Sequence, residues 1–357
     1  MRFILIVSVL ALSASILLMI IATVILRFAR TRIEARSLAN RAELRTLLVK
    51  FLSEDLNPGE LRLLKTSGSA ELEELSETML AKVKGRAKDI LVSFLESRGT
   101  VEQAIRRTTQ RGYLGRCRAA AFLGHIGSAE AREPLEAMLR DRRRDVRITA
   151  ARSLGYLGDP KSIPALLTGL DYHRRLLPFG TVLVALMRIG SSGQDLVGVG
   201  LRSGGERQRA VAAEFLGLTG AIRFTTELVD LLVNDRSLDV RIRSARALGR
   251  IGSPSTITPL IGCLDKNNAT GLRTVSCAAL AAIGGGQVVS EICQLIEEDD
   301  YLISSAAAKA VSQMGPLGTE CLDQIAKANS AGSPYAKEVL ARVAARVVDK
   351  TQNQSEI

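Results

Sequence analysis

Hydrophobic and polar positions divide the chain into a short apolar start and a long repetitive remainder. Residues 3–26 form an uncharged run of 24 residues whose polar members are only three Ser and one Thr. As a helix, this run would extend about 36 Å, enough to cross a hydrocarbon core of about 30 Å. A secretory signal peptide has a shorter apolar region of about 7–15 residues behind a basic start, and here only Arg2 precedes the run. The pattern therefore predicts a single transmembrane helix within an anchor of residues 1–27.

Basic residues cluster on one side of this predicted helix. Those that follow it closely are Arg27, Arg30, Arg32, Arg36, Arg41 and Arg45, against Arg2 before it. The positive-inside rule then predicts a single-pass protein of the cell (inner or plasma) membrane whose C-terminal bulk is cytoplasmic. The stretch from Arg27 to Arg45 is also expected to contact anionic lipid headgroups.

A second pattern is a phrase that ends in glycine and recurs along the chain. The closing glycines are Gly127, Gly158, Gly190, Gly220, Gly252, Gly284 and Gly315, at spacings of 31, 32, 30, 32, 32 and 31 residues. A period in this range is typical of solenoid proteins, whose short structural units stack one on the next.

Each period has the hydrophobic spacing of two helices. In the second unit, Val146, Ala150 and Leu154 recur at four-residue steps, which marks one face of an α-helix. Residues 158–160, Gly-Asp-Pro, then end that helix, because glycine suits a left-handed helix end and proline cannot continue the hydrogen-bond ladder. A further apolar face follows over residues 163–170. Each unit is therefore predicted to be a helical hairpin, with small residues that let neighbouring helices approach closely.

Two units carry a further signature in their first helix. Asp145-Val146-Arg147 and Asp239-Val240-Arg241 are each followed by Ala-x-x-Leu-Gly. This combination resembles the short HEAT-like repeats of the bilin-lyase type, and the resemblance covers about residues 112–330. It implies a scaffold in which such Asp and Arg residues stitch adjacent repeats together. Asp145 and Asp239 are also expected to cap their helices.

The predicted fold is all-α: an α-solenoid of about seven HEAT-like helical hairpins, preceded by a single transmembrane helix. The chain is expected to contain the anchor (1–27), a helical stalk with a degenerate capping hairpin (28–111), the repeat solenoid (112–330), and a C-terminal capping helix with a disordered tail (331–357). Within the second of these parts, hydrophobic spacing predicts one helix over about residues 70–97.

Composition narrows the possible functions. The chain has 357 residues, of which 46% are hydrophobic and 4% aromatic, with no Trp, five Cys and two His. These counts exclude a disordered chain and a disulfide scaffold. The net charge of +11 suggests nucleic acid, but residues 1–50 supply +6 of it, from eight Arg and Lys against two Glu. The scarcity of stacking aromatic residues also disfavours nucleic acid, so a nucleic-acid-binding protein remains only an alternative.

Groups that support catalysis or metal binding are few. HEAT-like deoxyhypusine hydroxylases bind iron through His-Glu pairs, whereas here Ile126 follows His125 and Arg174 follows His173. The cysteines include no CxxC pair, and their odd number suits reduced thiols in a cytoplasmic domain. No catalytic residue, cofactor or metal is predicted, and the chain is not expected to be an enzyme. A bilin or chromophore lyase is the enzymatic alternative.

Two inter-repeat segments depart from the repeat pattern. Residues 171–179 place aromatic side chains beside adjacent Arg, and one repeat earlier a run of Arg occupies the corresponding turn. Because the turns of a solenoid stack along one edge, the two clusters are expected to form a continuous basic strip. The partner-binding residues predicted there are Arg140, Arg142, Arg143, Arg144, Tyr172, His173, Arg174, Arg175 and Phe179. Such a strip suits an acidic patch on a protein or an anionic membrane surface.

The function predicted from these patterns is that of a membrane-anchored cytoplasmic scaffold that binds or regulates a membrane-associated protein. A membrane enzyme such as a polysaccharide glycosyltransferase is one candidate partner.

Overall fold

The computed structural model describes residues 42–53, 75–76, 78–80, 82–171 and 176–355, with the isolated residues 19, 23 and 27. The predicted membrane helix over residues 3–26 thus lies almost wholly outside the described residues. Within them, no single helix is both long and apolar enough to span a membrane. The bent pair Phe179–Ile189 and Ser191–Arg202 meets that requirement only when its two helices, 105° apart, are taken together.

Contacts divide the chain into two compact units, residues 1–101 and 102–357. In the first unit, residues 42–52 and α4 (Arg86–Ser97) are helical. Its buried side chains include Leu48 and Leu91, and the rings of Phe51 and Phe94 lie 5.2 Å apart. The prediction of one helix over residues 70–97 is wrong, because Gly85 adopts a φ of 63° and α4 begins only after it.

The described residues of the second unit form seven successive helical hairpins, here called repeats 1 to 7, after α5 (Thr100–Arg107). The hairpins are α6 (Tyr113–Ile126) with α7 (Arg132–Met138), α8 (Arg144–Leu157) with α9 (Ile163–Thr168), α10 (Phe179–Ile189) with α11 (Gln194–Ser203), α12 (Glu206–Leu218) with α13 (Thr225–Asn234), α14 (Leu238–Ile251) with α15 (Ile257–Gly262), α16 (Thr270–Ile283) with α17 (Gly286–Ile296), and α18 (Tyr301–Val311) with α19 (Gly315–Ala328). The prediction of an all-α solenoid is confirmed. Helix α20 (Ser333–Ser355) follows and includes residues 349–355, which the sequence assigns to a disordered tail.

Five of the seven closing glycines directly follow the last residue of a helix, as predicted, whereas Gly220 lies one residue beyond the C-cap of α12 and Gly315 begins α19. Gly158 follows α8 with a φ of 73°, a left-handed conformation that costs glycine little.

The predicted N-caps are wrong. At the start of α14 the N-cap is Ser237, whose hydroxyl accepts a hydrogen bond from the Val240 N–H. Asp145 and Asp239 lie inside the first turn of their helices instead. There a negative charge is favoured by the helix dipole without capping a backbone N–H.

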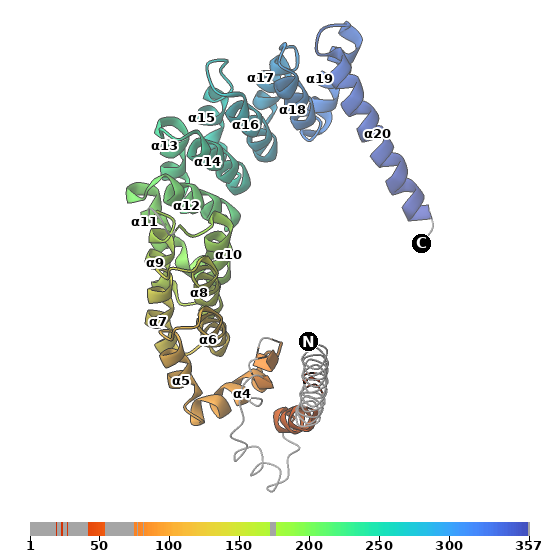
Figure 1. Ribbon diagram of the computed structural model, residues 1–357. Coiled ribbons are helices and arrows are strands. Elements are labelled where there is room, and N and C mark those ends of the chain that lie inside the picture. The colour runs from red at the N-terminus through yellow and green to blue at the C-terminus, as the bar shows by residue number, and fades with distance from the viewer. Residues whose placement is uncertain are drawn as a thin grey trace, which may run out of the picture. The chain divides into compact units, whose positions relative to one another are not determined.

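The first helices of the hairpins form one row and the second helices form another (Figure 1). We call α6, α8, α10, α12, α14, α16 and α18 the even row. Glycine lets neighbours in this row approach closely: a Cβ atom at Gly217 would lie 2.5 Å from Ala247 Cα, and one at Gly249 would lie 2.6 Å from Ala279 Cα. Each of these glycines is the third residue before a closing glycine. In repeat 3 that position is Met187, and α10 and α12 are the least extensively packed neighbours in the row.

Two of the five cysteines are not the reduced thiols that the sequence predicts. Cys293 of α17 and Cys321 of α19 form a disulfide, so the prediction that the cysteines are reduced thiols is wrong for this pair. Cys117, Cys263 and Cys277 are free. Burial raises the pKa of Cys277 to about 12, which leaves that thiol unreactive.

Candidate functional site

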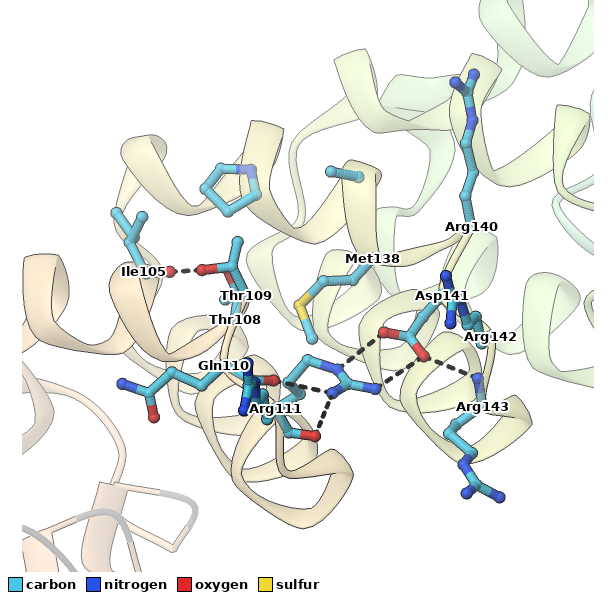
Figure 2. Close-up of a pocket in the computed structure, with 13 residues that line it drawn as sticks. Ile105, Thr108, Thr109, Gln110, Arg111, Met138, Arg140, Asp141, Arg142 and Arg143 are labelled. Atoms are coloured by element: carbon cyan, nitrogen blue, oxygen red, sulfur yellow. Dashed lines mark hydrogen bonds and ion pairs between the residues drawn. The ribbon is translucent and has the colours of Figure 1, made fainter.

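Three of the predicted arginines line an open pocket of about 810 Å³ at the turn between α7 and α8. Arg140, Arg142 and Arg143 form one side, and the turn that follows α5 forms the other, as Figure 2 shows. Ile105, Pro134, Ala137 and Met138 contribute apolar lining. The pocket therefore combines basic and apolar lining.

An arginine–carboxylate fork holds the two sides of this pocket together. Arg116 donates from Nε to Asp141 Oδ2 at 2.9 Å and from Nη2 to Oδ1 at 3.1 Å. Its Nη1 donates to the carbonyl of Gln110 at 2.9 Å. Asp141 Oδ1 also accepts the N–H of Arg143 at 2.8 Å. These contacts fix the turn after α5 relative to the turn before α8.

The single carboxylate of the pocket is already neutralised. Burial by itself would raise the pKa of Asp141, but its hydrogen bonds with Arg143 and Arg116, and the charges of Arg116 and Arg147, hold it below the usual value. Asp141 therefore stays ionised at neutral pH and serves as the partner of Arg116. It is not a group that accepts a proton from a ligand.

The pocket carries an excess of positive charge. Five arginines line it (Arg111, Arg116, Arg140, Arg142 and Arg143), against the one carboxylate of Asp141, which leaves +4. Within the described residues, the guanidinium groups of Arg111 and Arg142 make no hydrogen bond or ion pair, and both side chains are exposed. The Arg143 guanidinium lies 5.7 Å from the centre of the Tyr113 ring. Such a concentration of one charge attracts anionic groups and speeds their encounter with the site.

The structure does not place all of the predicted residues in this pocket. Arg144 is the first residue of α8 and is exposed outside the lining. Phe179 is the first residue of α10, where the guanidinium of Arg243 lies 4.1 Å from its ring centre. Tyr172, His173, Arg174 and Arg175 lie outside the described residues. The continuity of the basic strip therefore stays a prediction.

Two pocket residues, Arg111 and Arg116, are missing from the residues predicted from the sequence. Both nevertheless occupy positions at which arginine recurs with the repeat period. Arg111 precedes Arg142 by 31 residues, one repeat period. Arg116 is the eleventh residue before a closing glycine, a position that is also arginine at Arg147, Arg209, Arg241 and Arg273.

These arginines stitch neighbouring segments, as the resemblance implies. Arg209 Nε donates to Asp235 at 2.6 Å, and Arg273 Nη2 donates to both oxygens of Glu298 at 2.8 Å. Arg241 Nε donates to the carbonyl of Leu232 at 2.9 Å, which ties α14 to the end of α13.

Of the two histidines, His125 lies within the described residues and has structural partners. His125 Nδ1 lies 2.7 Å from the Ala121 carbonyl, and its ring centre lies 4.5 Å from that of Tyr156. Among the residues that the structure describes, no group of three or more His, Cys, Asp and Glu side chains could hold a metal ion.

Comparison with known proteins identifies the repeats. The family model described as HEAT repeats matches residues 101–176 and 200–281, so these two stretches are similar to HEAT repeats. The unmatched residues between them include α10, the first helix of repeat 3. No curated protein matches the sequence.

Solved structures are similar to this chain at low sequence identity. A mutant of Kap121p is 12% identical over 84% of this chain and 39% of its own, with a TM-score of 0.56. This chain thus spans about two fifths of the length of Kap121p. An engineered protein is 18% identical over 85% of this chain and 95% of its own, with a TM-score of 0.40. The complex of CpcE and CpcF of phycocyanin lyase from Nostoc sp. PCC7120 is 21% identical over 70% of this chain and 96% of that chain, with a TM-score of 0.29. At such identities, the similarity to Kap121p shows an α-solenoid fold alone.

Proposed function

We propose that this protein is a membrane-anchored scaffold whose basic pocket binds an acidic surface of a membrane-associated protein. The observation that supports this function is the +4 excess of arginine around one neutralised carboxylate at an exposed edge of the repeats. The fold agrees with a binding role: Kap121p, which shares it, is known in complex with the SUMO protease Ulp1p.

The chemistry of the pocket favours a carboxylate-rich partner. Arginine presents its donors as a planar fork that matches a carboxylate in two parallel hydrogen bonds. Arg111 and Arg142 approach the pocket from opposite sides, so one acidic loop can contact both. The apolar lining of the pocket gives such a loop a place for an aliphatic or methionine side chain.

The anchor proposed for residues 3–26 confines the scaffold to the surface where its partner resides. Confinement raises the effective concentration of the partner, so that a modest intrinsic affinity suffices. The arginines after the anchor favour a cytoplasmic repeat domain. The Cys293–Cys321 disulfide points the other way, because such bonds are rare in the cytoplasm of mesophiles.

The compartment is decided by trapping thiols in intact cells. Cells are quenched with acid, and the protein is then denatured and alkylated with a mass-tagged maleimide with and without prior reduction. If the domain is cytoplasmic, we expect the reducing compartment to keep Cys293 and Cys321 as thiols, so that all five cysteines are alkylated without prior reduction. Protection of Cys293 and Cys321 until reduction would contradict that placement.

The binding function is tested by purifying the tagged full-length protein from its native membranes in mild detergent. The variant reverses two arginines, Arg111→Glu and Arg142→Glu. A matched control, Arg207→Glu with Lys337→Glu, makes the same charge change at exposed positions outside the pocket. We expect a stoichiometric partner with the parent and the control, and its loss from the pocket variant.

Mass spectrometry of the partner then shows whether it is a membrane enzyme, such as a polysaccharide glycosyltransferase. Equal recovery of the partner by all three proteins would contradict the role of the pocket. Recovery of the protein alone with nucleic acid or a coloured chromophore would contradict the scaffold function.

A further inference from the structure

A second surface, independent of the basic pocket, lies on the even row at α14 and α16. It is an open groove of about 400 Å³ between these two helices. Half of its lining residues are small, namely Gly249, Ala278, Ala279 and Ala282, and Val275 adds further apolar surface. Arg246 and Arg250 of α14 stand along one side.

The groove exists because α14 and α16 approach so closely. A Cβ at Gly249 would lie 2.6 Å from Ala279 Cα and 2.7 Å from Ala279 Cβ, so no larger residue fits at that crossing. Ala278 and Ala282 lie one helical turn apart on α16, and both are exposed. The result is an apolar channel that a partner's side chain can enter without displacing a side chain of this protein.

The arginines beside the groove share one buried carboxylate. Glu214 of α12 is only 6% exposed, and it contacts Arg250 at 2.6 Å, Arg243 at 3.2 Å and Arg246 at 3.6 Å. Burial opposes the ionisation of Glu214, but the hydrogen bond from Arg250 and the three positive charges keep its pKa below the usual value. One carboxylate thus faces three guanidinium groups.

These three guanidinium groups differ in how many other contacts they make. Arg243 also pairs with Asp239 at 2.9 Å and lies over the Phe179 ring. Among the residues that the structure describes, Arg246 pairs only with Glu214, at 3.6 Å, and its side chain is 42% exposed. Arg250 is 36% exposed. Positive charge therefore remains available on the side of the groove that Arg246 and Arg250 form.

We propose that this groove binds an acidic helical segment of a partner protein. An aliphatic side chain of the segment occupies the channel over Ala278 and Ala282, and carboxylates one helical turn apart contact Arg246 and Arg250. The spacing fits because residues four apart on a helix lie about 6 Å apart on one face, on both the protein and its ligand. No aromatic residue lines the groove, so it lacks the stacking platform that a single-stranded nucleic acid uses.

The test is a fluorescence anisotropy titration of the purified full-length protein in detergent. The probe is a labelled synthetic helical peptide that combines leucine with glutamate at four-residue spacing. The matched peptide has glutamine in place of every glutamate. We expect the glutamate peptide to bind about tenfold more tightly, because hydrogen bonds between two charged groups are stronger than neutral ones.

Two variants locate the binding. Arg246→Glu is expected to weaken the glutamate peptide about tenfold through charge reversal, and Ala278→Leu to weaken it about tenfold by filling the channel. Arg207→Glu makes the same charge change on α12 outside the groove and should leave the affinity unchanged. Ala278 is exposed, whereas Arg246 is only partly exposed and lies 3.6 Å from buried Glu214, so Arg246→Glu is expected to lower the thermal midpoint. Ala278→Leu changes no partner of Glu214 and should keep the midpoint of the parent, which separates lost binding from lost folding.

Several outcomes would overturn the proposal. They are no binding of the glutamate peptide, equal binding of the glutamine peptide, or unchanged affinity in both groove variants. Equally strong, Arg246-dependent binding of single-stranded DNA or of phosphatidylglycerol vesicles would also overturn it, because the groove would then be a general anion surface.

Discussion

Repeats 4 and 5 and repeat 3 are built from the same hairpin but join their neighbours differently. In repeats 4 and 5, a glycine three residues before the closing glycine faces an alanine of the next helix, as Gly217 does with Ala247. Their first helices also carry the stitching arginines Arg209 and Arg241. Repeat 3 has Met187 and Phe179 at these two positions, and α10 packs less extensively on α12.

This difference shows that the hairpin and the junction are separate properties of the sequence. Repeat 3 keeps its apolar core, since Val182, Ala185 and Leu186 are buried. It also accepts the preceding repeat normally, because Gly155 of α8 faces Ala185 across a close crossing. Of the two junctions of repeat 3, only the one between α10 and α12 differs from those of repeats 4 and 5, because Met187, whose side chain is 40% exposed, takes the place of the glycine. The family model loses its match around this helix, although the hairpin itself persists.

The largest expected effect comes from removing a stitch. Asp235 is nearly buried, and Arg209 binds it through Nε at 2.6 Å and Nη2 at 3.1 Å. Asp235→Ala should lower the free energy of unfolding by about 3 kcal/mol, because it leaves a partly buried guanidinium without its carboxylate. Phe179→Ala, at the equivalent position to Arg209 in repeat 3, should cost only about 1 kcal/mol for its ring contacts. Urea denaturation measures both, and equal losses would remove the distinction between these repeats.

The next effect concerns the close crossings. Gly249→Ala should destabilise the protein by about 2 kcal/mol, since the new methyl group meets backbone that cannot move aside. The matched control is Gly180→Ala in α10, where nothing lies within 4 Å of the added Cβ. That change should stabilise by about 0.5 kcal/mol through helix propensity. Stabilisation by both substitutions would show that the α14–α16 crossing is looser than described.

A substitution at the α10–α12 junction should have a smaller effect on the free energy of unfolding. Met187→Ala is expected to change the free energy of unfolding by less than about 1 kcal/mol, because the side chain is partly exposed and leaves no enclosed cavity. Differential scanning calorimetry detects the shift in melting temperature. A loss above about 2 kcal/mol would identify Met187 as a core residue of the α10–α12 junction.

Acid should weaken the stitched repeats gradually. The pKa of Asp235 is lowered, since the hydrogen bonds from Arg209 and Ser237 outweigh the cost of burial. A carboxyl whose folded pKa is below its unfolded value stabilises the protein above the unfolded pKa, and this contribution is lost as pH falls through the folded pKa. The melting temperature of Asp235→Asn should therefore fall less than that of the parent between about pH 6 and pH 3. Parallel curves would show that Asp235 does not contribute to the acid sensitivity.

Much of this fold was predictable because it depends on local signals that recur. The closing glycines predict the helix ends, and Gly127, Gly158 and Gly252 indeed adopt left-handed conformations there. The apolar spacing predicts the buried faces, which include Val146, Ala150 and Leu154. Solenoids favour such inference, since each repeat packs mainly against its neighbours in the chain.

The ion pairs of the pocket and of the groove could not be predicted, because they depend on which residues of separate segments come into contact. The fork between Arg116 and Asp141 joins positions 25 residues apart, and the cluster on Glu214 joins positions up to 36 apart. No periodicity of a single helix reveals these pairs. Helix starts were also misassigned, because Ser237 and Asp239 are both good cap residues and only the backbone shows which one precedes the first turn.

The glycine–alanine pairing makes consecutive close crossings between first helices interchangeable. Gly217 faces Ala247, and Gly249 faces Ala279, so consecutive joints use the same pair of residue types. Loss of one period, such as residues 221–252, would bring Gly217 opposite Ala279 and regenerate a joint of the same composition. Unequal recombination that loses this period would therefore keep the backbone crossing, but it would remove Arg243, Arg246 and Arg250, the partners of buried Glu214. The close crossings of repeats 4 and 5 are thus interchangeable, whereas their ion pairs join particular repeats and limit where the array can be shortened.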